Sequence, residues 1–323
     1  MKRMWILAIA IAAAAARPGG AVEPPADEPA LCAMDWVRDA ARDGFRQGSP
    51  AYKKYLRALL KEAALTMPVD ALRAAVASES DPATLEALGA ALATRASYDE
   101  DPTLLQVLLE RARRDADPKL RAAAVRGLRA TGSVETMASF DDSLGYEALV
   151  RDPSPEVRAA VAENLVVENK DVYGGRDARL ADTAARVAAA SSDPEVAAQI
   201  LSSISMEQAS AETVANLRSA LAAEDPRLRA GAALALGSAP PDRATPDVLV
   251  AQFWRETDAD VRKAILHALA RFGQATAIPI LRSLRGAAPQ LDLEIDAWIA
   301  ALELGLQEWH LIVREKLKRT TPR

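Results

Sequence analysis

The sequence contains few of the side chains from which catalytic and metal sites are built. It has one cysteine, Cys32, and two histidines, His267 and His310, in 323 residues. Neither histidine stands in a His-Glu-x-x-His or Cys-x-x-Cys pattern, and a zinc site usually needs three or four nitrogen or sulfur ligands. An all-carboxylate site stays open because Asp and Glu number 45, although an acid-rich surface is their ordinary role. We therefore expect no catalytic residues, no metal and no cofactor, and predict that the protein is not an enzyme.

The single cysteine excludes an intrachain disulfide. Three states of Cys32 remain: a free buried thiol, a lipidated thiol and an interchain disulfide. Lipid attachment is disfavoured because the large Leu31 precedes the cysteine, where such motifs carry a small residue. We expect a buried, unreactive thiol.

Two further stretches carry residues typical of binding surfaces. The segment "VENKDVYGGRDAR", residues 167 to 179, allows a tight turn at Gly174 and Gly175 and offers Tyr173 to a partner. The segment "FWRE", residues 253 to 256, has adjacent aromatics that cannot both face a core, so Trp254 is a second candidate. The alternatives are a tolerated insertion in the first case and packing between helices in the second.

The elements that position these residues are predicted by one recurring phrase, "SPEVRAAVAENL", at residues 154 to 165. Ser154 can accept a hydrogen bond from a free N–H of the first turn, and Pro155 suits the first helical position. Val157, Val161 and Leu165 are four residues apart and share one face of the helix. That apolar face requires a neighbour.

The same pattern occurs seven more times. Each copy has a capping position, in most copies followed by proline, and residues three, seven and eleven positions after it that are almost all apolar. These sets are Tyr52, Leu56 and Leu60 after Ser49; Thr84, Leu88 and Leu92 after Asp81; Leu120, Ala124 and Leu128 after Asp117; Val196, Ile200 and Ile204 after Asp193; Leu228, Ala232 and Leu236 after Asp225; Val261, Ile265 and Leu269 after Asp258; and Leu291, Ile295 and Ile299 after Ala288. The Asp81 copy is weaker, the Asp258 copy lacks proline and the Ala288 copy lacks a polar cap. Successive caps are 32, 36, 37, 39, 32, 33 and 30 residues apart, which is the period of a helical repeat.

Each interval leaves room for one more helix. Suitable segments begin at Val69, Thr103, Arg179, Ala211 and Ala277. Each repeat is therefore expected to hold a first helix, a tight turn and a second helix, the second being the one that follows the cap. The low aromatic content of 4% also suits helices that approach closely.

The second-helix pattern Asp-Pro-x-Val/Leu-Arg-x-x-Ala resembles the HEAT repeat family over roughly residues 49 to 304. The resemblance implies a right-handed α-solenoid of about eight helix pairs, placed at residues 31–305 and closed by a capping helix and basic tail at 306–323. It also implies structural roles, with hydrogen bonds along the stack, for the turn and arginine residues Asp117, Arg121, Ser154, Arg158, Asp193, Asp225, Arg229, Asp258 and Arg262. Leu85, Ala197 and Asp292 stand where the family has the arginine, so those repeats should be tied less tightly.

The first residues have the layout of a secretory signal peptide. Lys2 and Arg3 precede an apolar run too short to span a bilayer, and a Pro-Gly-Gly break follows. We expect cleavage after Ala21, a Pro-rich acidic spacer at residues 22–30, and a periplasmic or secreted protein with no stable membrane insertion. An uncleaved anchor helix is the alternative. Cleavage would shift the formal charge from −5 to −8.

Residues two and six positions after each first apolar residue should line the exposed, concave side of the repeats. No identical side chain recurs there, which argues against a repeat-by-repeat code. We expect another protein as the partner, bound through Arg126, Glu163 and His267. An acidic chain disfavours nucleic acid. The alternatives are a lyase or enzyme-maturation factor, as in HEAT-like proteins associated with bilin lyases, and a nucleic-acid binder similar to the HEAT-like DNA glycosylases.

Overall fold

A computed structural model describes residues 30–129, 145–273 and 276–304, with the side chains of 30–36, 272 and 273 left undescribed. Within these ranges every regular element is helical and no strand occurs, which confirms the all-α prediction. The predicted signal peptide and spacer, the C-terminal capping helix with His310, and the side chain of Cys32 lie outside the described part. None of the helices in the described part is both long enough and apolar enough to cross a bilayer.

The helices group into two compact units, each of which is described by itself. Of the described residues, unit 1 holds 30–129 and 153–164, while unit 2 holds 145–152, 165–273 and 276–304. The repeat region predicted at 31–305 is thus divided between them.

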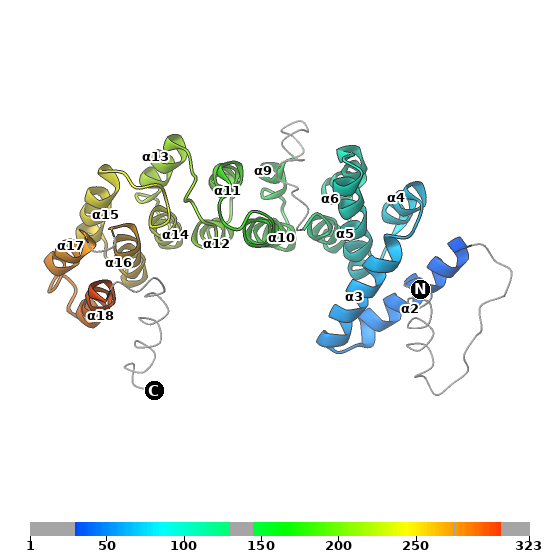
Figure 1. Cartoon of the computed structure of the whole chain (residues 1–323), viewed down its shortest axis with the longest axis horizontal. Helices are drawn as coiled ribbons and strands as arrows, with labels where there is room; N and C mark the ends of the chain where they lie inside the picture. The colour runs from blue at the N-terminus through cyan, green and yellow to red at the C-terminus, as the bar shows by residue number, and fades with distance from the viewer. Residues whose placement is uncertain (1–29, 130–144, 274–275, 305–323) are drawn as a thin grey trace. The chain divides into compact units, whose positions relative to one another are not determined.

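Unit 1 consists of two rows of helices (Figure 1). Its elements are α2 (Ala30–Gln47), α3 (Pro50–Ala64), α4 (Val69–Ser78), α5 (Pro82–Tyr98), the 3-10 helix η1 (Pro102–Leu105), α6 (Gln106–Arg114), α7 (Pro118–Gly127) and the first part of α10 (Pro155–Val167). The second helices α3, α5 and α7 pack side by side, and the first helices α4 and α6 pack against each other. At the end of this unit, the Asn164 amide of α10 donates a hydrogen bond to the carbonyl of Val125 in α7.

Unit 2 repeats the arrangement. Its elements are α9 (Tyr146–Leu149), the end of α10, the π-helix η3 (Glu168–Val172), α11 (Ala178–Ala190), α12 (Pro194–Ser203), α13 (Ala211–Ala220), α14 (Pro226–Leu236), α15 (Ala244–Arg255), α16 (Ala259–Gly273), α17 (Ala277–Ser283), the 3-10 helix η5 (Pro289–Leu291) and α18 (Asp292–Glu303). The second helices α12, α14, α16 and α18 pack in that order. The first helices α9, α11 and α13 form the other row, and each of α11, α13, α15 and α17 packs on the second helix that follows it.

The predicted caps begin the second helices. Each accepts a hydrogen bond through its side chain from a backbone N–H two or three residues ahead: Ser49, Asp81, Asp117, Ser154, Asp193, Asp225 and Asp258. Ala288 has no such group, and there the short helix η5 precedes α18. The predicted first-helix segments also become helices, and the one beginning at Val69 coincides with α4.

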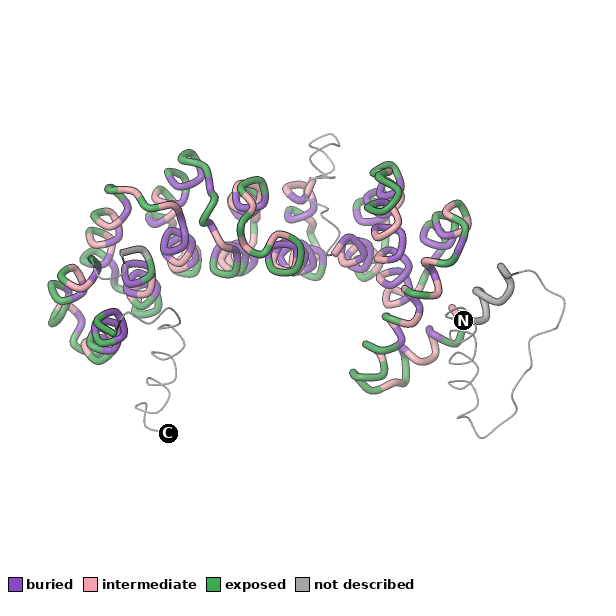
Figure 2. The backbone as a smooth tube through the Cα atoms, viewed as in Figure 1, coloured by how far each residue is buried: buried purple, intermediate pink, exposed green. Residues whose placement is uncertain are grey.

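The apolar stripes of the second helices form the core (Figure 2). All of the predicted stripe residues are buried except Leu120 and Leu228, which are half-buried, and Tyr52, which is 40% exposed. Tyr52 belongs to α3, which begins the row of second helices in the described chain. No earlier helix of that row covers its ring. Its ring lies beside Gly44 of α2 and Gly48, directly after that helix.

Adjacent second helices approach so closely that some contact points have no room for a side chain. A Cβ atom placed on Gly127 of α7 would lie 3.1 Å from the Cα atom of Gly89 in α5. A Cβ atom on Gly237, directly after α14, would lie 2.7 Å from the Cα atom of Ala268 in α16. Gly237 has a helical φ of −64°, so the close approach, and not its backbone conformation, requires glycine there.

We predict that Gly237→Ala destabilises the protein by about 1–3 kcal/mol, because the added methyl group meets backbone atoms that cannot rotate away. Helix propensity alone would have the opposite sign, favouring alanine by about 1 kcal/mol. Denaturant unfolding measures the difference. Ala215→Gly, on the exposed face of α13, gives the propensity effect by itself. A Gly237→Ala variant more stable than the parent would refute the steric account.

Candidate functional site

Arg126 and Glu163, predicted to bind a partner, lie next to each other in unit 1. The Nε atom of Arg126 on α7 donates to a carboxylate oxygen of Glu163 on α10 at 2.9 Å. Arg129 donates to the same oxygen at 3.0 Å. The three side chains are 29 to 41% exposed. They form a surface network of two positive charges and one negative charge, in which a partner would meet a net positive site.

His267 lies in unit 2, where its ring stacks on the indole of Trp298 in α18. The ring centroids are 5.3 Å apart and the planes differ by 17°. Trp298 is only 4% exposed, so the half-buried imidazole covers it. One turn before Trp298, burial raises the pKa of Glu294, an effect opposed by the neighbouring indole of Trp298 and by the charge of Lys263. His267 is therefore part of a packed polar and aromatic cluster between α16 and α18.

Trp254 and Tyr173 differ in their availability to a partner. Trp254 on α15 is 55% exposed, whereas its neighbour Phe253 is fully buried and meets it edge to face, with centroids 6.4 Å apart. Tyr173 is half-buried at the end of η3. The glycines after Tyr173 make the predicted tight turn, with positive φ angles of 58° and 76° that favour glycine.

The five predicted contact residues are not gathered into one described site. Arg126 and Glu163 belong to unit 1, while Tyr173, Trp254 and His267 belong to unit 2. Within the units, the structure joins Arg126 to Glu163 and His267 to Trp298.

The arginines at the HEAT-like position contact the turn or the first helix of their own helix pair. Arg121, Arg158 and Arg229 donate to backbone carbonyls of the turn before their own helix. The guanidinium of Arg262 lies over the ring of Phe253, 5.5 Å from its centroid. Arg229 also binds Glu256 of the next repeat, at 2.7 and 2.9 Å. The bonds to backbone carbonyls form because a side chain one turn into the second helix reaches the free carbonyl groups of the turn before that helix.

Two buried glutamates that the sequence analysis missed organise the turns between helices. Glu79 is 1% exposed and Glu256 is 4% exposed. One oxygen of each accepts hydrogen bonds from the next two backbone N–H groups, at 2.9 Å for Glu79 and 3.0 Å for Glu256. Their arginine partners come from a preceding repeat: Arg38 and Arg42 bind Glu79, as Arg229 binds Glu256. The signal in the sequence is Glu-Ser/Thr-Asp, with the glutamate two residues before the cap.

The two carboxylates are held ionised by these contacts. The hydrogen bond from Arg229 lowers the pKa of Glu256 to about 2, against the opposing effect of burial. For Glu79, burial acts to raise the pKa, but the backbone N–H of Asp81 and the two arginines outweigh it and the pKa is lowered. Both groups thus favour the folded chain at neutral pH.

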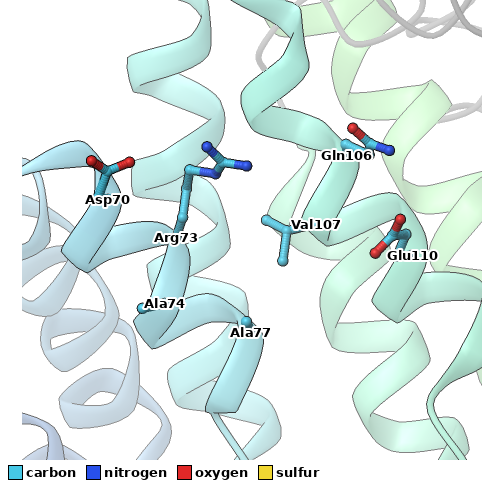
Figure 3. Close-up of a pocket in the computed structure, with 7 residues that line it drawn as sticks. All are labelled: Asp70, Arg73, Ala74, Ala77, Gln106, Val107 and Glu110. Atoms are coloured by element: carbon cyan, nitrogen blue, oxygen red, sulfur yellow. The ribbon is translucent and has the colours of Figure 1, made fainter.

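The first helices α4 and α6 of unit 1 border an open hollow of about 490 Å³ (Figure 3). Its lining residues are Asp70, Arg73, Ala74, Ala77, Gln106, Val107 and Glu110. In the part of the chain that the structure describes, no group of three or more His, Cys, Asp or Glu side chains is placed to hold a metal ion.

Comparisons with known proteins identify no family. No family model and no curated protein matches the chain. Two solved structures of engineered proteins from the Northeast Structural Genomics Consortium are similar to it. The first has 18% identity and a TM-score of 0.36, covering 82% of this chain and 78% of its own. The second has 16% identity and a TM-score of 0.29, covering 83% and 97%. At these TM-scores neither likeness establishes the fold.

We predict that Glu256→Gln destabilises the protein at pH 7 and has a smaller effect at pH 3. The folded pKa of about 2 lies below the value of about 4.3 for an unfolded glutamate, so the unfolded chain binds more protons between these values. The stabilisation is fully present above about pH 5 and is lost as the pH falls toward 2. Denaturant unfolding of parent and variant at both pH values measures it. An equal difference at pH 3 and pH 7 would show that ionisation of Glu256 is irrelevant.

Proposed function

We propose that the chain is a right-handed α-solenoid of about eight HEAT-like helix pairs that acts as a non-catalytic scaffold for another protein. The observation that supports this most is the order of packing. In each unit the second helices pack on their neighbours in the row, α3–α5–α7 and α12–α14–α16–α18, and each keeps a partly exposed face. Repeat proteins use such a row of helix faces as a binding surface.

The side chains on this face are chemically mixed. Unit 1 presents the network of Arg126, Arg129 and Glu163, and unit 2 presents Lys263 beside His267. Other second helices carry small residues at the corresponding positions, such as Ala198 and Ala230. Both signs of charge over an alanine-rich background suit a polar protein surface better than a nucleic acid or a bare hydrophobic segment.

We further propose that the scaffold works outside the cytoplasm, in the periplasm or after secretion. The support is the charged start, short apolar run and helix break of the first 21 residues. The partner is therefore to be sought among exported or envelope proteins, and Trp254, the most exposed tryptophan of the described chain, is a further candidate contact.

The test reverses the charge of the unit 1 network without dismantling it. In the triple variant Arg126→Glu, Arg129→Glu and Glu163→Arg, the three side chains can still pair, because every charge is inverted together. We predict that this variant loses capture of the native partner from the envelope fraction at least tenfold while keeping its helical content by circular dichroism.

The matched control is Glu147→Arg with Arg186→Glu, which inverts the exposed pair joining α9 to α11 at 2.9 Å on the first helices of unit 2. The control should capture the partner as the parent does. If the triple variant captures normally, or if the control loses capture equally, the second helices of unit 1 are not the binding surface.

A further inference from the structure

The hollow between α4 and α6 lies on the first helices, away from the surface proposed above. Three of its lining residues are small or apolar, Ala74 and Ala77 of α4 and Val107 of α6. Figure 3 shows Arg73 extending from α4 toward α6, which carries Gln106, Val107 and Glu110. The helices are tied at one end, because Arg111 of α6 donates a buried hydrogen bond of 2.6 Å to the carbonyl of Val76 in α4.

The polar side chains around the hollow lack partners within the described chain. Asp70, Arg73, Gln106 and Glu110 make no hydrogen bond or ion pair with any described residue, although Arg73 and Glu110 have opposite charges and border the same space. Three of the four are charged, and all four are exposed.

The corresponding junctions of unit 2 are bridged instead. Arg186 of α11 binds Glu147 of α9 at 2.9 Å. Asp182 of α11 accepts from the hydroxyl of Thr213 in α13 at 2.7 Å. Arg218 of α13 binds Asp242, which caps α15, at 3.1 Å. At these three junctions of unit 2 the charged side chains between first helices thus have partners, whereas the charged groups at the α4–α6 junction have none within the described chain.

We propose that this hollow binds a basic peptide segment of a partner protein through an arginine side chain. The walls carry two carboxylates and one guanidinium, so their net charge of −1 favours a cation. The aliphatic stem of an arginine would lie against Ala74, Ala77 and Val107. Its planar guanidinium matches the geometry of a carboxylate. Arg73 and Gln106 would then donate to peptide carbonyls. The site is independent of the second-helix surface.

The probe is a pentapeptide with capped ends, Ala-Ala-Arg-Ala-Ala, and its matched neutral control has citrulline in place of arginine. Titration into the isotopically labelled full chain, followed by amide chemical shifts, should perturb residues 70–77 and 106–110. We expect a Kd on the order of 1 mM, typical of a small, solvent-open contact. The citrulline peptide should bind at least fivefold more weakly.

The decisive variant is Asp70→Asn with Glu110→Gln, which removes both negative charges and keeps the shape of the hollow. It should weaken binding of the arginine peptide by roughly 5- to 10-fold, as expected for losing charge-assisted hydrogen bonds in a partly exposed site. The control Glu212→Gln with Asp247→Asn removes two exposed acids from first helices of unit 2, and should change binding less than twofold.

Three results would overturn the proposal. They are an absence of shift changes up to 10-fold above the expected Kd, shift changes located outside the two segments, and an equal loss of binding in both double variants. The last result would mean that the peptide responds only to the overall acidity of the chain. Neither double variant changes Arg126, Arg129 or Glu163. These outcomes therefore do not depend on whether the scaffold proposal holds.

Discussion

The close approach of neighbouring second helices is the constraint on which the rest of the structure depends. At Gly89 and Gly127, and at Gly237 and Ala268, backbones meet with no space for a larger side chain. Helices this close can bury a narrow stripe of valine, leucine and isoleucine completely, so the core needs few aromatic residues. A similar approach occurs between α14 and α12, where a Cβ atom on Gly231 would lie 3.1 Å from the Cα atom of Ala198. Low aromatic content, abundant alanine and serial packing are therefore consequences of one geometry.

The turns between the two helices of each pair fix how neighbouring pairs are positioned against each other. Each cap binds the start of its own helix, and arginines such as Arg229 bind the free carbonyls of the turn before it. At two turns a buried glutamate adds a link to the preceding repeat. Because a buried carboxylate without partners is costly, these links are effective only when the arginine and both N–H groups are in place. The turns thus hold neighbouring pairs at the distance that the small residues allow.

Much of this arrangement could be predicted from the sequence because it depends on local signals. The Ser154 and Asp193 caps, the stripe of Val157, Val161 and Leu165, and the helix beginning at Val69 all follow from rules within one helix. The exposure of Tyr52 depends on its place at the end of a row, which the phrase alone does not encode.

The side-chain partners were less predictable, since they depend on contacts between residues far apart in the chain. The stack of His267 on Trp298, and the pair of Arg126 with Glu163, each join two second helices across 31 and 37 residues of sequence. Glu79 and Glu256 were marked by a repeated Glu-Ser/Thr-Asp, but only the structure shows that arginines from an earlier repeat reach them. The hollow between α4 and α6 has no sequence signal, because it depends on how two helices about 30 residues apart in the chain are placed against each other.

The central claim is that the apolar stripe between second helices, more than the polar turns, holds the chain together. It is tested most directly by the free energies of unfolding of Ile265→Ala and Asp225→Ala, both in unit 2 and measured by denaturant titration. Ile265 is fully buried in α16, and truncating it should cost about 2–5 kcal/mol. Asp225 caps α14 at the surface, and losing that cap should cost about 1 kcal/mol. Equal losses, or a larger loss for Asp225→Ala, would contradict the account.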